Sequence, residues 1–219
     1  MRYNNPQELL AKAHSLAGFT LGELATQFEA TVPAHLLRQK GWVGQFIEYL
    51  LGAESASLAQ ADFPEIGVEL KTLPIDSQGR PLESTYVSVV PLINIQGVTW
   101  DNSVVKNKLM HVLWIPIVAD KALPIEQRQI ATPFLWQPSD HQVALLRKDF
   151  EDALDTIAMG NIEHIDARFG ELLQIRPKAA NSQSLTEAIG PEGHTILTLP
   201  RGFYLRPQFT RQIVKQQFN

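Results

Sequence analysis

The chain has 219 residues, of which 44% are hydrophobic and 19% charged, with a formal net charge of −4. This length suits one domain of ordinary to large size, or one domain divided into two lobes, and the apolar content suffices for a core. No apolar run approaches the ~18 residues of a membrane span, and we expect no signal peptide and no membrane partner. The absence of cysteine excludes disulfides and thiolate metal sites, and it is compatible with a cytoplasmic location.

The charge is unevenly distributed. Residues 172–219 have a local charge of +4, because they include six basic residues and only two acidic residues. The basic residues are Arg176, Lys178, Arg201, Arg206, Arg211 and Lys215. One DNA-facing surface on an otherwise acidic protein is compatible with this pattern, and so is ordinary solubility charge.

Three short helices are predicted in the first quarter of the chain. Asn5 begins an amphipathic helix that ends near Gly18, and Thr20 caps a second helix. The third helix, over residues 43–51, is apolar at helical spacing and contains Glu48. An exposed position is the simpler interpretation of this glutamate, although the helix directly precedes the most distinctive stretch of the chain.

That stretch runs from Asp62 to Lys71. After Gly67 the sequence alternates as a strand does, so Glu69 and Lys71 share one face, with their Cα atoms roughly 6–7 Å apart. Two carboxylates can bind a hard divalent cation, and a neighbouring lysine can handle the attacking water or the phosphate charge. Metal-dependent phosphodiester cleavage uses such a set. A solvated strand face, or an edge protected from aggregation, is the competing interpretation.

The remaining elements alternate between strands and helices. Strands are expected at 85–93 and 109–118, both buried and beside the first strand, and at 172–175 and 194–199. Helices are expected at about 140–159, with an acidic solvated face, at 184–189 and at 207–217. No internal repeat and no firm domain boundary is present, so residues 1–219 are predicted to form a single domain. The six histidines show no zinc-site spacing.

Several segments, in the same order and over nearly the whole chain, resemble the MutH family of bacterial methyl-directed mismatch repair nucleases. They are Asp62…Glu69-Leu-Lys71, Lys40-Gly-Trp-Val-Gly, Asp76-Ser-Gln-Gly-Arg-Pro-Leu-Glu83, Val112-Leu-Trp-Ile-Pro116, Leu173-Gln-Ile-Arg-Pro-Lys-Ala-Ala-Asn181 and Leu199-Pro-Arg-Gly-Phe-Tyr204. The resemblance implies an α/β fold like that of restriction endonucleases, with a mixed β-sheet core flanked by helices and two lobes around a DNA-binding cleft. It also implies a nuclease that nicks the unmethylated strand 5′ to G at hemimethylated GATC sites.

The resemblance further implies roles for four residues in catalysis. Asp62 and Glu69 are expected to bind the metal, and Lys71 to be the catalytic lysine. Glu48 is expected to support a second metal. The cofactor would be one or two Mg²⁺ ions, with Mn²⁺ as a substitute.

A second group of residues is expected to contact DNA. The resemblance places Lys40 near the cleavage site and Tyr86 at a DNA-contact position, and it implies that Tyr204 senses adenine methylation. Arg176 and Lys178 are expected to read bases, with Pro177 restricting the loop between them. From the residues alone, Arg-Pro-Lys would be a surface loop and Tyr204 a core residue.

The expected partners are double-stranded DNA with hemimethylated or unmethylated GATC, MutL as activator and, indirectly, MutS. The protein is expected to be a monomer and to associate with the nucleoid during repair. Two alternatives remain: a related restriction endonuclease that cuts both strands, and a DNA-binding module that does not cut. The complete set of Asp62, Glu69 and Lys71 argues against the second.

Overall fold

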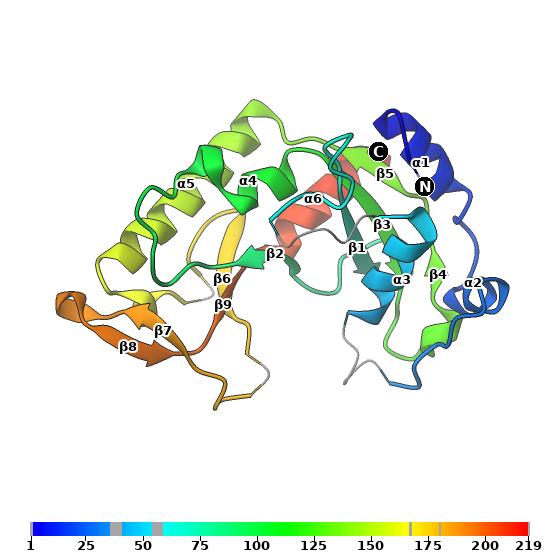
Figure 1. Cartoon of the computed structure of the whole chain (residues 1–219). Coiled ribbons are helices and arrows are strands. Elements are labelled where there is room, and N and C mark those ends of the chain that lie inside the picture. Colours follow the sequence, from blue (N-terminus) through cyan, green and yellow to red (C-terminus); the bar gives the residue numbers. More distant parts are fainter. Residues whose placement is uncertain (1, 36–40, 54–58, 167, 180, 219) are drawn as a thin grey trace. The chain divides into compact units, whose positions relative to one another are not determined.

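The chain divides into two compact units. The computed structural model describes residues 2–35, 41–53, 59–166, 168–179 and 181–218. The first unit comprises residues 1–83, 110–137 and 213–219, and the second comprises residues 84–109 and 138–212. Both units mix helices with β-sheet (Figure 1), which confirms the predicted α/β class.

The helices and strands follow one another along the whole chain. The helices are α1 (Pro6–His14), α2 (Leu21–Gln27), α3 (Trp42–Leu51), α4 (Val104–Leu109), α5 (Asp140–Ala158) and α6 (Pro207–Phe218). The strands are β1 (Glu69–Ile75), β2 (Thr85–Val89), β3 (Val112–Val118), β4 (Gln129–Ile130), β5 (Phe134–Trp136), β6 (Leu173–Pro177), β7 (Thr186–Ile189), β8 (Thr195–Thr198) and β9 (Arg201–Leu205). Short 3-10 turns lie at Trp100–Asn102, Ile125–Gln127, Ile162–His164 and Pro191–Gly193. Within the described residues, no helix is both long and apolar enough to cross a membrane.

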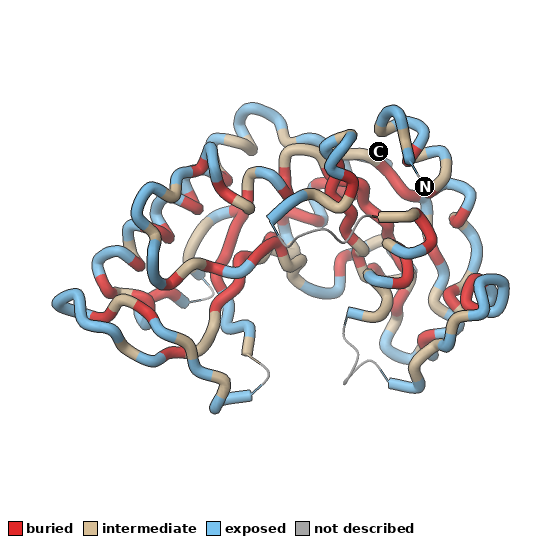
Figure 2. The backbone as a smooth tube through the Cα atoms, viewed as in Figure 1, coloured by how far each residue is buried: buried red, intermediate tan, exposed pale blue. Residues whose placement is uncertain are grey.

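The first unit is built on a mixed sheet. Strand β1 pairs in parallel with β3, with Glu69 opposite Val112 and Lys71 opposite Trp114. Both β4 and β5 pair antiparallel with β3. Residues Val112 to Ile117 of β3 are buried, as expected for the central strand of a covered sheet, and Figure 2 shows this buried stretch.

Three helices cover this sheet, and local sequence explains where each begins or ends. The Asn5 side chain accepts from the N–H of Glu8 at the start of α1, and Thr20 and Glu23 form a capping box at the start of α2. Helix α3 ends at Gly52, whose φ of 68° suits a glycine. Side chains of all three helices pack with β1 and β3 in one core cluster.

The second unit has a three-stranded antiparallel sheet in the order β2-β9-β6. Helix α5 packs against β6, and Phe150 of this helix lies 5.5 Å from Phe203 of β9, measured between ring centroids. Buried and exposed stretches alternate along α5 in Figure 2, as expected for an amphipathic helix. The long helix predicted at 140–159 is therefore confirmed.

Two predictions about the second unit are wrong. The strand predicted at 85–93 ends at Val89 and belongs to the β2-β9-β6 sheet, so it does not lie beside β1. Residues 186–189, predicted to be part of a helix, form strand β7 and pair with β8. Leucine, glutamate and alanine in residues 185–189 favour a helix, but cross-strand pairing outweighs this weak local preference.

Candidate active site

A tight hairpin turns the chain into β1. Phe63 and Val68 form an isolated antiparallel bridge, with Phe63 N–H donating to the Val68 carbonyl at 2.9 Å and the reverse bond at 3.2 Å. Pro64 and Gly67 lie in the loop between them, and Gly67 has a φ of +63°, which a side chain would disfavour. The hairpin therefore depends on the glycine that the sequence analysis placed before the strand.

This hairpin brings Asp62 to the start of β1. Asp62 and Glu69 are the residues directly outside the bridged pair, one on each of the two chain segments. The Asp62 Oδ2 atom accepts a hydrogen bond of 2.9 Å from the backbone N–H of Leu70. The Asp62 carboxylate is therefore fixed to the backbone of β1, one residue after Glu69.

Glu69 and Lys71 form a buried ion pair. The Lys71 Nζ atom lies 2.9 Å from Glu69 Oε1, and the two side chains are only 8% and 3% exposed, respectively. The backbone N–H of Glu69 donates to the carbonyl of His111 at 3.0 Å, which ties the start of β1 to β3. Burial of this degree excludes the solvated strand face considered above. Buried charges persist when they are paired or serve a function.

Glu48 lies on α3, the helix that packs against β1. Its side chain is half-buried. Among the residues with described positions, no group of three or more His, Cys, Asp or Glu side chains is arranged to hold a metal ion. Glu48 thus lies on the helix next to β1, and among the described residues no three-carboxylate cluster is assembled.

The donors of this site fit a hard divalent cation. Asp62 and Glu69 supply carboxylate oxygens from the two sides of one hairpin. Magnesium takes one or two protein carboxylates and completes its shell with water and substrate phosphate oxygens, so two carboxylates suffice. The chain contains no cysteine, so the site has no thiolate ligand that would favour a softer metal over magnesium.

Three residues expected to contact DNA gather on the β2-β9-β6 sheet. Tyr86 pairs with Tyr204 across β2 and β9, and their ring centroids lie 5.4 Å apart in an edge-to-face arrangement. Lys178, just beyond the end of β6, holds its Nζ atom 3.1 Å from the centroid of the Tyr86 ring. Burial, and to a lesser degree Tyr204, raises the pKa of Tyr86 to about 12.

Tyr204 lies on the face of β9 opposite the core. Phe203, its neighbour, is buried and packs on Phe150, whereas Tyr204 is only partly buried and contacts Tyr86. Successive strand residues point to opposite faces, so the two aromatic side chains separate there. Tyr204 therefore is not part of the apolar core behind the sheet.

Arg176 and Pro177 are the last two residues of β6, and both are exposed. The Arg176 Nη1 atom donates to Ser84 Oγ at 2.7 Å, which orients the guanidinium. Lys40, the remaining predicted DNA contact, lies outside the described residues.

Two further residues support this surface, although nothing in the expected site pointed to them. Gly202 lies opposite Arg176 in the sheet, and a Cβ atom there would come within 2.9 Å of the Tyr204 ring and 3.1 Å of the Tyr86 ring. A glycine inside a strand pattern is a usable signal of such close approach.

The second residue is Asp149, which is buried on α5 although the acidic side of this helix was expected to be solvated. Its carboxylate accepts hydrogen bonds of 2.7 to 2.9 Å from the backbone N–H groups of Glu171, Leu172 and Leu173. These bonds anchor the start of β6, the strand that ends with Arg176. No pattern in the sequence distinguishes Asp149 from the exposed acids around it.

The candidate catalytic residues thus come from the first unit, and the candidate DNA contacts, apart from Lys40, come from the second. In the first, Asp62, Glu69 and Lys71 are gathered at the start of β1. In the second, Tyr86, Lys178 and Tyr204 are in mutual contact through Tyr86.

Comparison with known proteins identifies relatives of this chain over nearly its whole length. A family model described as "DNA mismatch repair enzyme MutH" matches residues 51–149, which include the Asp62–Lys71 hairpin. A DNA mismatch repair protein MutH from Shewanella woodyi is 52% identical over 211 residues, covering 96% of this chain and 91% of that protein. The corresponding protein of Pectobacterium atrosepticum is 53% identical over 214 residues, covering 98% and 93%.

Proposed function

This chain belongs to the MutH family of DNA mismatch repair enzymes, and from that premise we propose how it cuts DNA. It nicks the unmethylated strand 5′ to G at hemimethylated GATC sites by Mg²⁺-dependent hydrolysis of a phosphodiester bond. The observation that carries this proposal is the buried Glu69–Lys71 pair, with the Asp62 carboxylate bonded to the neighbouring backbone of β1. A lysine and two carboxylates in this arrangement supply a cation site and a positive charge side by side.

The chain's own residues have distinct tasks in this reaction. Asp62 and Glu69 would hold the cation, which would supply Lewis-acid stabilisation of the charge on the scissile phosphate. Lys71 orients the attacking water and offsets the negative charge that grows on the phosphoryl oxygens. Its bond to Glu69 holds the ammonium in position before substrate arrives. Glu48, on the adjoining helix, supports a second cation.

Sequence recognition is assigned to the sheet of the second unit. The planar guanidinium of Arg176 matches O6 and N7 of guanine, and such a bidentate pair discriminates by about 1–3 kcal/mol. Lys178 and Pro177 complete this reading edge, Tyr86 and Lys40 contact the DNA, and Tyr204 lies against the adenine N6 position. A methyl group on N6 removes a donor hydrogen and adds bulk in the major groove, so it would collide with a rigid phenol.

The proposed partners follow from the same family membership. Free in the bacterial cytoplasm and on the nucleoid, the protein works as a monomer, activated by MutL after MutS has bound a mismatch. Manganese substitutes for magnesium, since both are hard cations with oxygen ligands. Intrinsic nicking is slow without MutL.

A strand-labelled cleavage assay tests this function. Hemimethylated GATC duplexes, with each strand labelled separately, are incubated with the protein and Mg²⁺, with and without MutL, and with EDTA as control. We expect one nick, on the unmethylated strand, that EDTA abolishes and MutL accelerates. Cutting of both strands would identify a restriction endonuclease instead, and binding without any cleavage would identify a DNA-binding module.

A further inference from the structure

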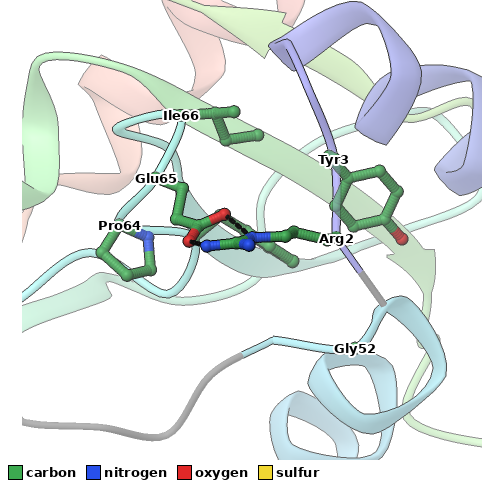
Figure 3. Close-up of a pocket in the computed structure, with 7 residues that line it drawn as sticks. Arg2, Tyr3, Gly52, Pro64, Glu65 and Ile66 are labelled. Carbon is green, nitrogen blue, oxygen red and sulfur yellow. Dashed lines mark hydrogen bonds and ion pairs between the residues drawn. The ribbon is translucent and has the colours of Figure 1, made fainter.

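We infer that Tyr3 is a positioning residue that holds the carboxylate-bearing elements of the first unit in register for cation binding. The inference rests on the proposed function, because it concerns the same Asp62, Glu69 and Glu48 side chains. Tyr3 precedes α1 and lies at a pocket next to the hairpin, which Figure 3 shows. Each of its contacts lies close in sequence to one of these acids.

The hydroxyl of Tyr3 joins it to the end of α3. It donates a hydrogen bond of 2.7 Å to the carbonyl of Leu51. The last turn of α3 is otherwise closed by backbone bonds, from Gly52 N–H to the Tyr49 carbonyl and from Ala53 N–H to the Glu48 carbonyl. The phenol thus binds a helix-terminal carbonyl one turn away from Glu48.

The ring of Tyr3 joins it to the hairpin. It meets Phe63 edge-to-face, with ring centroids 5.7 Å apart and an interplanar angle of 75°. Phe63 follows Asp62 directly, and its backbone makes both bridge bonds to Val68, the neighbour of Glu69. A shift of the Phe63 ring would therefore move both carboxylates of the hairpin together.

A second contact fastens the same segment to the hairpin loop. The Arg2 guanidinium makes two hydrogen bonds to the Glu65 carboxylate, drawn as dashed lines in Figure 3. Arg2 is 82% exposed, and ion pairs in such positions stabilise little. We therefore expect the partly buried Tyr3, through its aromatic packing and its hydrogen bond, to stabilise this arrangement more than the Arg2–Glu65 pair does.

The physical reason for a catalytic effect is geometric. Cation affinity falls when any of the few carboxylates that hold the ions is displaced, because magnesium binds through only one or two protein carboxylates. Removing the Tyr3 hydroxyl frees the end of α3, which carries Glu48, from the hairpin but leaves the ring on Phe63. The effect should appear in cation affinity more than in DNA affinity, since Tyr86, Arg176, Pro177, Lys178 and Tyr204 belong to the other unit.

The experiment compares Tyr3→Phe and Tyr3→Ala with Tyr49→Phe. Tyr49 is on α3 as well, but it is 67% exposed, so its variant removes a hydroxyl from the same helix without touching the hairpin. Calorimetric titration of Mn²⁺ into each full-length protein without DNA gives cation affinity directly. Nicking of an unmethylated GATC duplex over a range of Mg²⁺ concentrations gives the half-saturating concentration and the maximal rate. Binding of the same duplex in EDTA and thermal unfolding complete the set.

For Tyr3→Phe we expect Mn²⁺ binding to weaken by up to about fivefold, with a similar rise in half-saturating Mg²⁺, because the loss is limited to the free energy of the one hydrogen bond removed. Saturating Mg²⁺ should restore the maximal nicking rate of Tyr3→Phe, and its binding to the duplex in EDTA should be unchanged. Tyr49→Phe should have the same cation affinity and nicking rate as the unmodified protein. Tyr3→Ala should weaken cation binding further, and if it fails to fold, the Phe variant decides. Unchanged cation affinity in Tyr3→Phe, or a loss explained by unfolded protein alone, overturns the inference.

The two proposals fail in different ways. A parent protein that binds Mn²⁺ but does not nick GATC refutes the proposed function, and the calorimetric comparison still decides the role of Tyr3. A parent protein that binds no Mn²⁺ overturns the role of Tyr3 as well.

Discussion

The ammonium of Lys178 lies 3.1 Å from the centroid of the Tyr86 ring, although the two residues are far apart in the sequence. A cation–π contact at an exposed site contributes about 0.5–1 kcal/mol of stabilisation. This contact links Lys178, which follows β6, to Tyr86, whose ring in turn contacts Tyr204. It holds a positive charge in place before DNA binds. We therefore expect the residues of this sheet to act as one recognition surface, whose members can be separated by substitution.

Base reading should be separable from backbone contact. Arg176→Ala and Lys178→Ala should lower cleavage at GATC far more than they lower non-specific binding, because base contacts specify and phosphate contacts position. Lys40→Ala should weaken binding evenly across sequences and reduce the salt slope by about one unit. Competition between GATC and scrambled duplexes at two salt concentrations measures this. Equal losses of specific and non-specific binding in Arg176→Ala would make it a phosphate contact.

Tyr204→Ser should reduce discrimination between methylated and unmethylated strands. A serine is too small to collide with an N6-methyl group, so nicking of unmethylated DNA should persist while nicking of the methylated strand rises. Rates on both strands of hemimethylated and fully methylated duplexes provide the test, with Tyr49→Ser as an exposed control. Unchanged discrimination together with lower thermal stability would assign Tyr204 a structural role only.

Lys71→Ala should abolish nicking but leave most DNA binding intact, because the lysine acts mainly in the transition state. It should also lower the free energy of unfolding, by up to about 3–5 kcal/mol, since Glu69 would keep a buried charge without this partner. Denaturant titration and strand-labelled cleavage measure the two effects. Lys121→Ala, at an exposed position of the same unit, is the control. Near-normal cleavage by Lys71→Ala would refute the site assignment.

Tyr86 should make stability depend on alkaline pH. Its folded pKa of about 12 lies above the ordinary value of 10.0, because burial disfavours the phenolate. The stabilisation is therefore complete below pH 10.0 and is lost progressively as the pH rises toward about 12. Denaturant titrations across this range should show a smaller decline for Tyr86→Phe than for Tyr49→Phe. An equal decline in both variants would mean that Tyr86 ionises normally.

The sequence alone was sufficient for the local features near the active site. Asn5, Thr20 and Gly52 begin or end helices as predicted, because capping depends on a few neighbouring residues. Alternation after Gly67 placed Glu69 and Lys71 on one strand face, since the side-chain period of a strand is two. The resemblance to the MutH family, which relatives about 50% identical confirm, also required only the sequence.

Only the tertiary structure decided which of these residues are buried and which meet. Whether Glu69 and Lys71 face water depends on the helices and strands that cover them, and alternation cannot reveal that. Residues 186–189 form a strand because β8 pairs with them, against their local preference for a helix. Tyr86, Lys178 and Tyr204 come into contact through strand pairing between distant segments, and Asp149 is buried because the start of β6 needs an acceptor for its backbone amides. Long-range pairing and burial are properties of the whole fold, so no local pattern in the sequence contains them.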